Sequence, residues 1–186
     1  MKAAKDQSAP GALDALRRFV NTVDFEPGGV DRFGDPGAAT GWLQEHGLLE
    51  ESDRLDEGGR ELVAGLREAF RLELLAHNGH ADPESAWAAL CGYADRAALG
   101  VRCSANPGDI ELVATGRGAQ VVAGRLFALM YDAIRTGQWQ RLKACHKETC
   151  LWAFYDHSKN GSGTWCDMAV CGNRAKAQRR RRKVAS

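Results

Sequence analysis

The sequence predicts an α+β protein, with a mostly helical N-terminal domain that contains a small β-hairpin, followed by a small cysteine-rich module. Helix-forming patterns fill most of the first 138 residues, four of the six cysteines lie within positions 145–171, and basic residues dominate the end of the chain. With 186 residues, 44% of them hydrophobic and 26% charged, the chain has the size and composition of one folded domain plus a small module.

Helix-capping signals divide the N-terminal part of the chain. A first helix is expected over residues 12–20, and Asp35 followed by Pro36 begins a second one that ends at Gly47. The segment 56–77 predicts a longer amphipathic helix, because apolar residues recur there at every fourth position. These residues are Leu62, Leu66, Phe70 and Leu74.

The remaining N-terminal elements are a fourth helix, a hairpin and a fifth helix. Asp82 and Pro83 repeat the cap signal and begin a helix that is expected to cover residues 82–99. The segment 101–116 then predicts two short strands around an Asn-Pro-Gly-Asp turn. The fifth helix covers residues 118–136, and four of its residues are expected to face the interior: Val121, Leu126, Leu129 and Ile134.

The N-terminal part offers few residues with a chemical role. It contains no nucleotide-binding loop and no Ser/His/Asp arrangement, so an enzyme is not expected. His46, His77 and His80 are isolated in the sequence, and exposed helix-end positions are the preferred interpretation. Cys91 lies in an apolar helical segment and Cys103 in a strand, so both are expected to be small buried side chains.

The charges are unevenly distributed along the chain. Residues 1–138 contain 14 Lys or Arg and 21 Asp or Glu, a balance of −7, whereas residues 139–186 contain 11 and 3, a balance of +8. This asymmetry indicates a polyanion as partner, most often nucleic acid. No stretch has the length and apolarity of a membrane span, and the N-terminus lacks the apolar core of a secretion signal. A cytoplasmic location is therefore expected, where clustered cysteines bind metal more often than they form disulfides.

The cysteine cluster has the spacing of a metal site. Two pairs, each with four residues between its members, are separated by fifteen residues, so that each pair can supply two sulfurs to one ion. A set of four thiolates favours one structural Zn²⁺. The predicted ligands are Cys145, Cys150, Cys166 and Cys171. Ligation by His146 or His157, a disulfide pair and an iron–sulfur cluster are the alternatives.

The local sequence around the second pair predicts how the site closes. The residues 151–165, LWAFYDHSKNGSGTW, are expected to form two strands joined by a turn, which returns Cys166 to the first pair. Asp167 then caps a helix that places Cys171 near its first turn. A knuckle, a hairpin and a helix that carries the last ligand describe a treble-clef-like zinc finger with four cysteine ligands.

The predicted last helix continues to about position 183 and is strongly basic. Arginine and glutamine side chains on such a helix can bind base edges in the major groove, and the remaining cations can bind phosphates. The residues predicted to bind nucleic acid are Arg174, Lys176, Gln178, Arg179, Arg180, Arg181, Arg182 and Lys183. A solvated tail, or binding to RNA or another acidic surface without specificity, are the alternatives.

Two segments resemble known protein families. Residues 141–183 are similar to the CGNR zinc finger, whose name is spelled by Cys171, Gly172, Asn173 and Arg174. The earlier FVNTVDF, at positions 19–25, resembles the opening of the ABATE domain, which precedes this finger in a family of bacterial stress-induced transcription regulators.

The resemblance implies a DNA-binding transcription regulator of two domains. Residues 139–186 would form the finger with its basic helix, and residues 1–138 the ABATE-like domain, which would sense a small molecule or stress signal or form a homodimer. The alternative is a finger that binds another protein. Its contact patch would contain Trp152, Phe154 and Tyr155, although their alternating spacing favours a small core.

Overall fold

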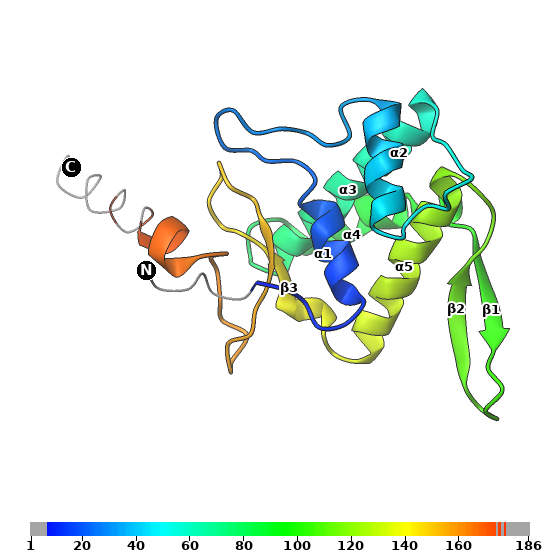
Figure 1. Ribbon diagram of the computed structural model, residues 1–186. Coiled ribbons are helices and arrows are strands. Elements are labelled where there is room, and N and C mark those ends of the chain that lie inside the picture. The colour runs from blue at the N-terminus through cyan, green and yellow to red at the C-terminus, as the bar shows by residue number, and fades with distance from the viewer. Residues whose placement is uncertain (1–6, 174, 176, 178–186) are drawn as a thin grey trace.

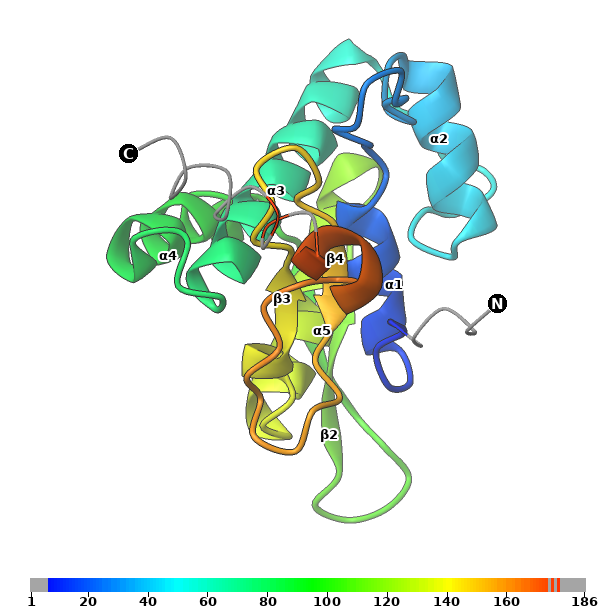
Figure 2. The same ribbon diagram turned by 90° about the vertical axis from the view of Figure 1, so that its left-hand side faces the viewer.

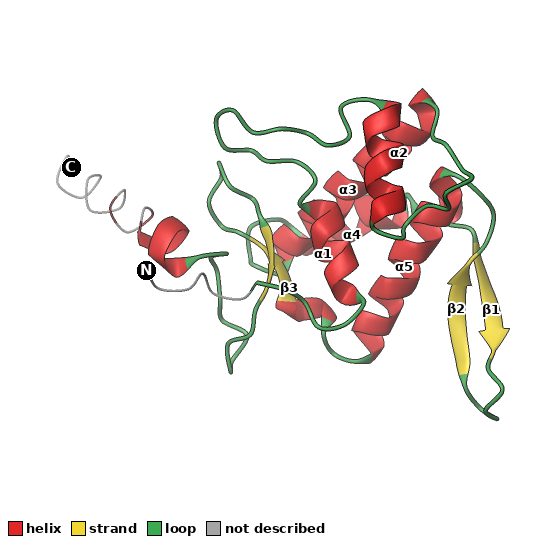
Figure 3. Ribbon diagram, viewed as in Figure 1, coloured by secondary structure: helices red, strands yellow, loops and turns green. Residues whose placement is uncertain are grey.

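The computed structural model describes residues 7–173, 175 and 177. The described residues form α-helices and two separate two-stranded antiparallel sheets (Figures 1 and 3). The helices are α1 (Leu13–Val20), α2 (Pro36–Glu45), α3 (Glu57–Ala76), α4 (Pro83–Cys91) and α5 (Ala119–Arg135). The strands are β1 (Leu99–Cys103), β2 (Ile110–Ala114), β3 (Leu142–Ala144) and β4 (Ala153–Tyr155). Short helical turns occur at η1 (Ala94–Arg96), η2 (Trp139–Arg141) and η3 (Met168–Gly172).

Three helices begin at the positions where the sequence predicts them, and each start is capped by an aspartate. The side chains of Asp35, Asp56 and Asp82 each accept a hydrogen bond from the backbone N–H three residues further on, at 2.7 to 2.9 Å. Such a bond satisfies one of the N–H groups that a helix leaves without an internal partner at its start. Pro36 and Pro83 follow two of these caps, where the missing N–H of proline costs nothing.

The helices α1 to α5 form the helical part of the protein, which we call the body, and α3 is the longest of them. Leu66, Phe70 and Leu74 on its inner face are fully buried, as their fourfold spacing predicts. The ring of Phe70 packs edge-on against Phe19 of α1, with 6.5 Å between the ring centroids, and its centroid lies 5.8 Å from that of Phe127 of α5. Each such buried side chain contributes about 1.5 to 3 kcal/mol. One core therefore unites the five helices with η2, β3 and β4.

Two expectations for the helices are wrong. Helix α4 ends at Cys91, and Leu99 belongs to β1, because it pairs with Ala114 across the hairpin and this pairing withdraws it from the helix. In α5, Val121 and Leu126 are buried and Leu129 packs partly buried against the core, as predicted, and Val122, Met130 and Ala133 are buried as well, but Ile134 is not. Ile134 follows directly after Ala133, about 100° further around the helix, and its side chain is 45% exposed.

The first hairpin confirms the predicted strand–turn–strand pattern and projects from the body, on the opposite side from the finger (Figure 1). The Asp109 N–H closes the turn by bonding to the Asn106 carbonyl at 3.2 Å. Cys103 is exposed on β1, and Cys91 is exposed at the end of α4, so the expectation that both are buried is wrong. Apolar neighbours in the sequence do not reveal which face of an element is covered.

The second hairpin differs from the one predicted for the finger. Strand β4 pairs with β3, which precedes the first cysteine pair, and the segment 158–165 contains no strand. All residues of β3 and β4 are buried, and the sheet packs against α1 and α3 (Figure 2). The expected pairing within residues 151–165 is therefore wrong, because β4 pairs with a strand that precedes Cys145 and not with a strand that follows it.

Candidate metal centre

The first cysteine pair lies in the loop that joins β3 to β4. The Cys145 N–H donates to the Trp152 carbonyl at 2.9 Å, which extends the ladder by one residue, and the Cys150 N–H closes a tight turn on the Lys147 carbonyl at 2.8 Å. Leu151, next in the chain, has a φ of 51°, a left-handed conformation that is rare for a side chain with a Cβ. The loop is thus a knuckle that returns Cys150 towards Cys145.

The second pair is held by a capped helical turn. The Asp167 carboxylate accepts hydrogen bonds from the N–H groups of Ala169 and Val170 at 2.6 and 2.9 Å. The Cys171 N–H bonds to the Asp167 carbonyl at 2.9 Å. The predicted cap at Asp167 is therefore confirmed, and Cys171 lies in the first turn, close to Cys166 at the end of the preceding loop.

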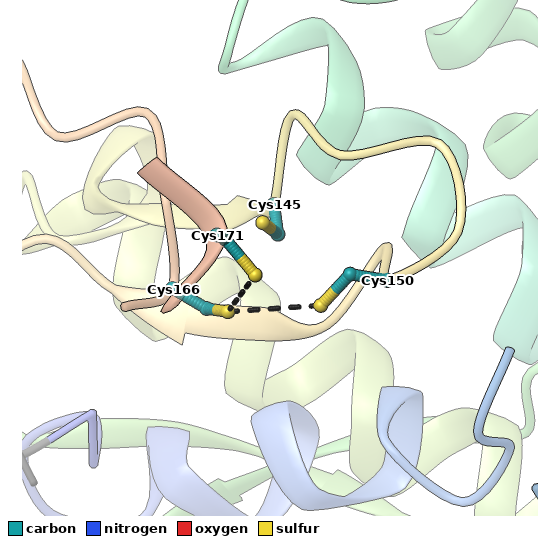
Figure 4. A group of neighbouring side chains, drawn as sticks. All are labelled: Cys145, Cys150, Cys166 and Cys171. Carbon is teal, nitrogen blue, oxygen red and sulfur yellow. Dashed lines mark hydrogen bonds between the residues drawn. The ribbon is translucent and has the colours of Figure 1, made fainter. Parts of the chain in front are cut away.

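The four cysteines converge on one point (Figure 4). Their Sγ atoms all lie within 4.8 Å of one another, and the Cys150–Cys166 and Cys166–Cys171 separations are both 3.7 Å. A tetrahedral zinc with Zn–S bonds of about 2.3 Å requires S–S edges of about 3.8 Å. Cys145, Cys166 and Cys171 are buried, and Cys150 is partly covered. The arrangement supports one structural zinc site with all four positions taken by sulfur.

The protonation of the cluster explains why a cation suits it. Hydrogen bonds from the thiols of Cys150 and Cys166 lower the pKa of Cys145. The pKa of Cys166 is raised, first because its thiol donates to Cys145. Burial, together with the negative charge at Cys145, raises the pKa of Cys171. Four crowded thiols cannot ionise together without a positive charge between them, and Zn²⁺ supplies that charge when it is bound.

The body holds both halves of the finger through one asparagine. Asn78, just after α3, donates from Nδ2 to the carbonyls of Ala144 and Thr164 at 2.8 and 3.0 Å. Ala144 immediately precedes Cys145, and Thr164 lies two residues before Cys166. Asn78 therefore fixes the separation of the segments that carry the two cysteine pairs.

Arg71 of α3 also contacts the knuckle. Its Nη1 donates to the Leu151 carbonyl at 2.9 Å, its other amino group bonds to the Val20 carbonyl, and Nε bonds to Glu68 at 3.0 Å. The side chain is only 3% exposed, and burial lowers its pKa. A buried guanidinium with these partners supports the left-handed turn at Leu151, next to a zinc ligand.

A third contact ties α1 to the same hairpin. Asn21 at the end of α1 accepts from the Ala153 N–H at 2.7 Å and donates to the Ala153 carbonyl at 2.9 Å. His77 at the end of α3 bonds through Nδ1 to the Leu142 carbonyl at 2.8 Å, and its side chain is 3% exposed. The expectation that His77 is exposed is therefore wrong, because β3 covers it.

A buried ion pair shapes the loop between the cysteine pairs. Lys143 and Asp156 meet at 3.0 Å, and Lys143 also donates to the Gly161 and Gly163 carbonyls. Asp156 accepts from the Gly163 N–H at 2.6 Å, and a Cβ at position 163 would lie 2.7 Å from Asp156 Oδ1. The ion pair and its hydrogen bonds therefore hold this loop in an irregular conformation, in a segment that was expected to form a strand. A side chain at position 163 would collide with Asp156, which accounts for the glycine there.

The predicted site residues fall into two groups. The four cysteines are brought together, and His146 and His157 lie outside the cluster. The predicted nucleic-acid contacts lie outside the described residues: Arg174, Lys176, Gln178, Arg179, Arg180, Arg181, Arg182 and Lys183. Asn78 and Arg71 were not predicted as functional residues, although an arginine within the apolar stripe of α3 was a signal that it has a buried partner.

Comparison with known proteins places this geometry in a family. Residues 141–183 match the CGNR zinc finger, and residues 11–136 match ABATE, described as "Putative stress-induced transcription regulator". None of the curated proteins compared with the chain matches it. Within the part of the chain that the structure describes, no helix has the length and apolarity needed to cross a membrane. The chain belongs to the ABATE family of transcription regulators, and its C-terminal zinc centre is a CGNR zinc finger.

Proposed function

We propose that the protein is a cytoplasmic, DNA-binding transcription regulator. Residues 139–186 form the DNA-binding finger, and residues 1–138 form a sensor domain. The zinc-held turn η3 leads directly into the basic segment, whose proposed DNA contacts are Arg174, Lys176, Gln178, Arg179, Arg180, Arg181, Arg182 and Lys183. The family membership and the four-sulfur centre support this proposal.

The main support for the proposal is that the four-cysteine centre is followed directly in the sequence by a strongly cationic segment. The segment 139–186 has a formal charge of +8, which a four-thiolate zinc site reduces to roughly +6. A charge of this size, attached to a centre that four sulfurs and the body contacts hold in place, suits a polyanion with regular phosphate spacing. Phosphates would supply the affinity, and side chains that reach base edges would supply the specificity.

A salt titration combined with selection from random duplex DNA tests the proposal. The zinc-loaded protein is expected to bind with an affinity that falls steeply with salt, and to enrich a sequence motif. Arg181→Ala is expected to reduce the slope of log K against log salt by about 0.9 for each phosphate that the variant no longer neutralises. Arg135→Ala, an exposed arginine on α5, is the matched control. Retention without an enriched motif would indicate a general polyanion or RNA binder.

A finger that binds another protein is the alternative, and the structure provides an observation against its simplest form. Phe154 and Tyr155 are 4% and 8% exposed, so they belong to the core and cannot form a contact patch with Trp152. Binding of the full chain to a partner protein, together with no retention on DNA at any salt concentration, would favour this alternative.

An open surface groove between α1, α2 and the knuckle is the proposed sensor site. Its volume is about 350 Å³, and Arg17, Arg18 and Arg32 line it together with Trp42, Trp152 and a single carboxylate, Glu45. Guanidinium and indole groups together suit a small aromatic anion. A simple aromatic carboxylate such as benzoate is the probe, and quenching of tryptophan fluorescence that Arg32→Ala weakens is the expected result. Equal quenching in the variant contradicts this assignment.

A further inference from the structure

Strand β1 presents an unpaired edge on the projecting hairpin. The N–H groups of Thr115 and Ser104 bond to the carbonyls of the residues directly opposite them, Ala98 and Asp109. Because hydrogen-bonded and non-hydrogen-bonded pairs alternate in an antiparallel sheet, the backbone groups of three residues between them point away from β2. These residues are Leu99, Val101 and Cys103, and no backbone partner for them occurs among the described residues.

The same three residues carry an apolar face. Leu99 and Val101 are 39% and 66% exposed, and Cys103 is exposed as well. Ile110 lies opposite Cys103 on β2 and is 61% exposed. Single exposed apolar residues are ordinary, but a continuous group along an open strand edge attracts another strand.

We propose that this edge pairs with the β1 strand of a second copy of the chain, antiparallel about a two-fold axis at Val101. Val101 then faces the partner's Val101, and Leu99 faces the partner's Cys103. Each outward N–H meets an outward carbonyl of the other copy, and the two hairpins become one four-stranded sheet. A sheet of this size is more stable than an isolated two-stranded hairpin.

Charge selects this register and favours a second copy over a foreign strand. Arg102 is the charged residue of β1, and it pairs with Glu111 across the hairpin at 2.9 Å. Centring the axis on Arg102 would place two guanidinium groups opposite each other. Centring it on Val101 places each Arg102 opposite the partner's Gly100, where no side chain competes for space. The edge is therefore complementary to itself, as a two-fold interface requires.

The position of the hairpin is compatible with the finger. The hairpin tip and the zinc centre lie on opposite sides of the body (Figure 1), so that pairing through β1 leaves the finger uncovered. A dimer can form whether or not the finger binds DNA, and the two are measured separately.

Sedimentation velocity of the zinc-loaded full chain tests the pairing, under reducing conditions that prevent exposed cysteines from cross-linking. The mass is expected to rise with concentration from 20.2 kDa to about twice this value. Val101→Lys places two lysines at the axis and is expected to weaken the dimer at least tenfold. Trp87→Lys, which changes another exposed apolar residue, is the matched control and should dimerise like the wild type.

A mixture provides the sharper test of the axis. Val101→Glu and Val101→Lys are each expected to be monomeric, and their equimolar mixture is expected to restore the dimer mass, because opposite charges then meet. Circular dichroism confirms that the variants fold. A wild type that stays monomeric, a Val101→Lys variant that stays dimeric, or a mixture that stays monomeric would each overturn the proposed pairing.

Discussion

The two hairpins share a secondary structure and differ in what stabilises them. Strands β3 and β4 have three residues each, all buried, whereas β1 and β2 have five residues each, none of them buried. The short hairpin is held by the body, through Asn78, Arg71 and Asn21. The long hairpin is held by its own ladder and by contact of its base with α5.

The difference shows how a small zinc finger can be built without a large core of its own. Three-residue strands are too short to be stable alone, so their geometry depends on the body and on the metal. Leu142, Ala144, Ala153 and Tyr155 belong to the same core as the helices. We therefore expect the zinc centre and the body to unfold together, and the projecting part of the β1–β2 hairpin, beyond its contact with α5, to contribute little to the stability of either.

Zinc removal is expected to lower the stability of the buried hairpin and the body more than any of the substitutions below. A ligand present at a thousandfold its Kd stabilises the folded state by about 4 kcal/mol, and its loss should lower the melting temperature by about 10 °C. The whole body should shift, because the finger strands share its core. Thermal unfolding with and without a chelator measures this change, and added zinc should reverse it. Cys91→Ser and Cys103→Ser are the controls and should show the same shift in melting temperature as the wild type. If the melting temperature of the body did not change on zinc removal, the zinc centre and the body would be independent.

Asn78→Ala should have the next largest effect. It removes the donor to two carbonyls, at Ala144 and Thr164, and is expected to cost about 2 kcal/mol. It should also lower zinc affinity about tenfold, as loss of a group that orients metal ligands does. Competition with a chelator measures the affinity, and urea unfolding measures the stability. Asn106→Ala, in the turn of the exposed hairpin, is the matched control and should change neither quantity. Unchanged zinc affinity in Asn78→Ala would limit Asn78 to a role in packing.

Acid should weaken the buried hairpin through Asp156. Burial alone would raise the pKa of this carboxyl, but hydrogen bonds from Ser158, Lys143 and Gly163 outweigh it and hold the pKa below its usual value. Because the folded-state pKa is depressed, its contribution to stability is complete above about pH 4 and is lost as the pH falls through the folded-state value.

Urea unfolding at two pH values, near neutrality and at about pH 3, measures this loss. Asp156→Asn is expected to be less stable at neutral pH and to lose less on acidification than the wild type. Asp109→Asn, in the exposed turn, should follow the wild type at both pH values. An equal acid loss in Asp156→Asn and in the wild type would contradict the assignment to Asp156.

The sequence predicted those features that depend on neighbouring residues. The helix starts at Asp35, Asp56 and Asp82, the exposed hairpin and the cap at Asp167 all depend on hydrogen bonds within a few residues. The spacing of the four cysteines likewise indicated the ligand set that the structure brings together.

The sequence did not predict contacts between distant segments. The partner of β4 precedes the knuckle, and the Lys143–Asp156 pair closes the loop where a local turn signal favoured a hairpin. Asn78 and Arg71 act on residues 66 to 86 positions further along the chain. No local pattern indicates which carbonyl such a side chain will reach.

Arg102→Ala, in the exposed hairpin, is expected to have the smallest effect on the free energy of unfolding. The Arg102–Glu111 pair has the same 2.9 to 3.0 Å geometry as the Lys143–Asp156 pair, but its side chains are 64% and 56% exposed. Water screens such pairs, so the loss should be at most about 0.5 kcal/mol. A double-mutant cycle with Glu111→Ala, measured by urea unfolding at low protein concentration, isolates the coupling. A coupling above about 1 kcal/mol would mean that the projecting hairpin is tied to the stability of the body, as the buried one is.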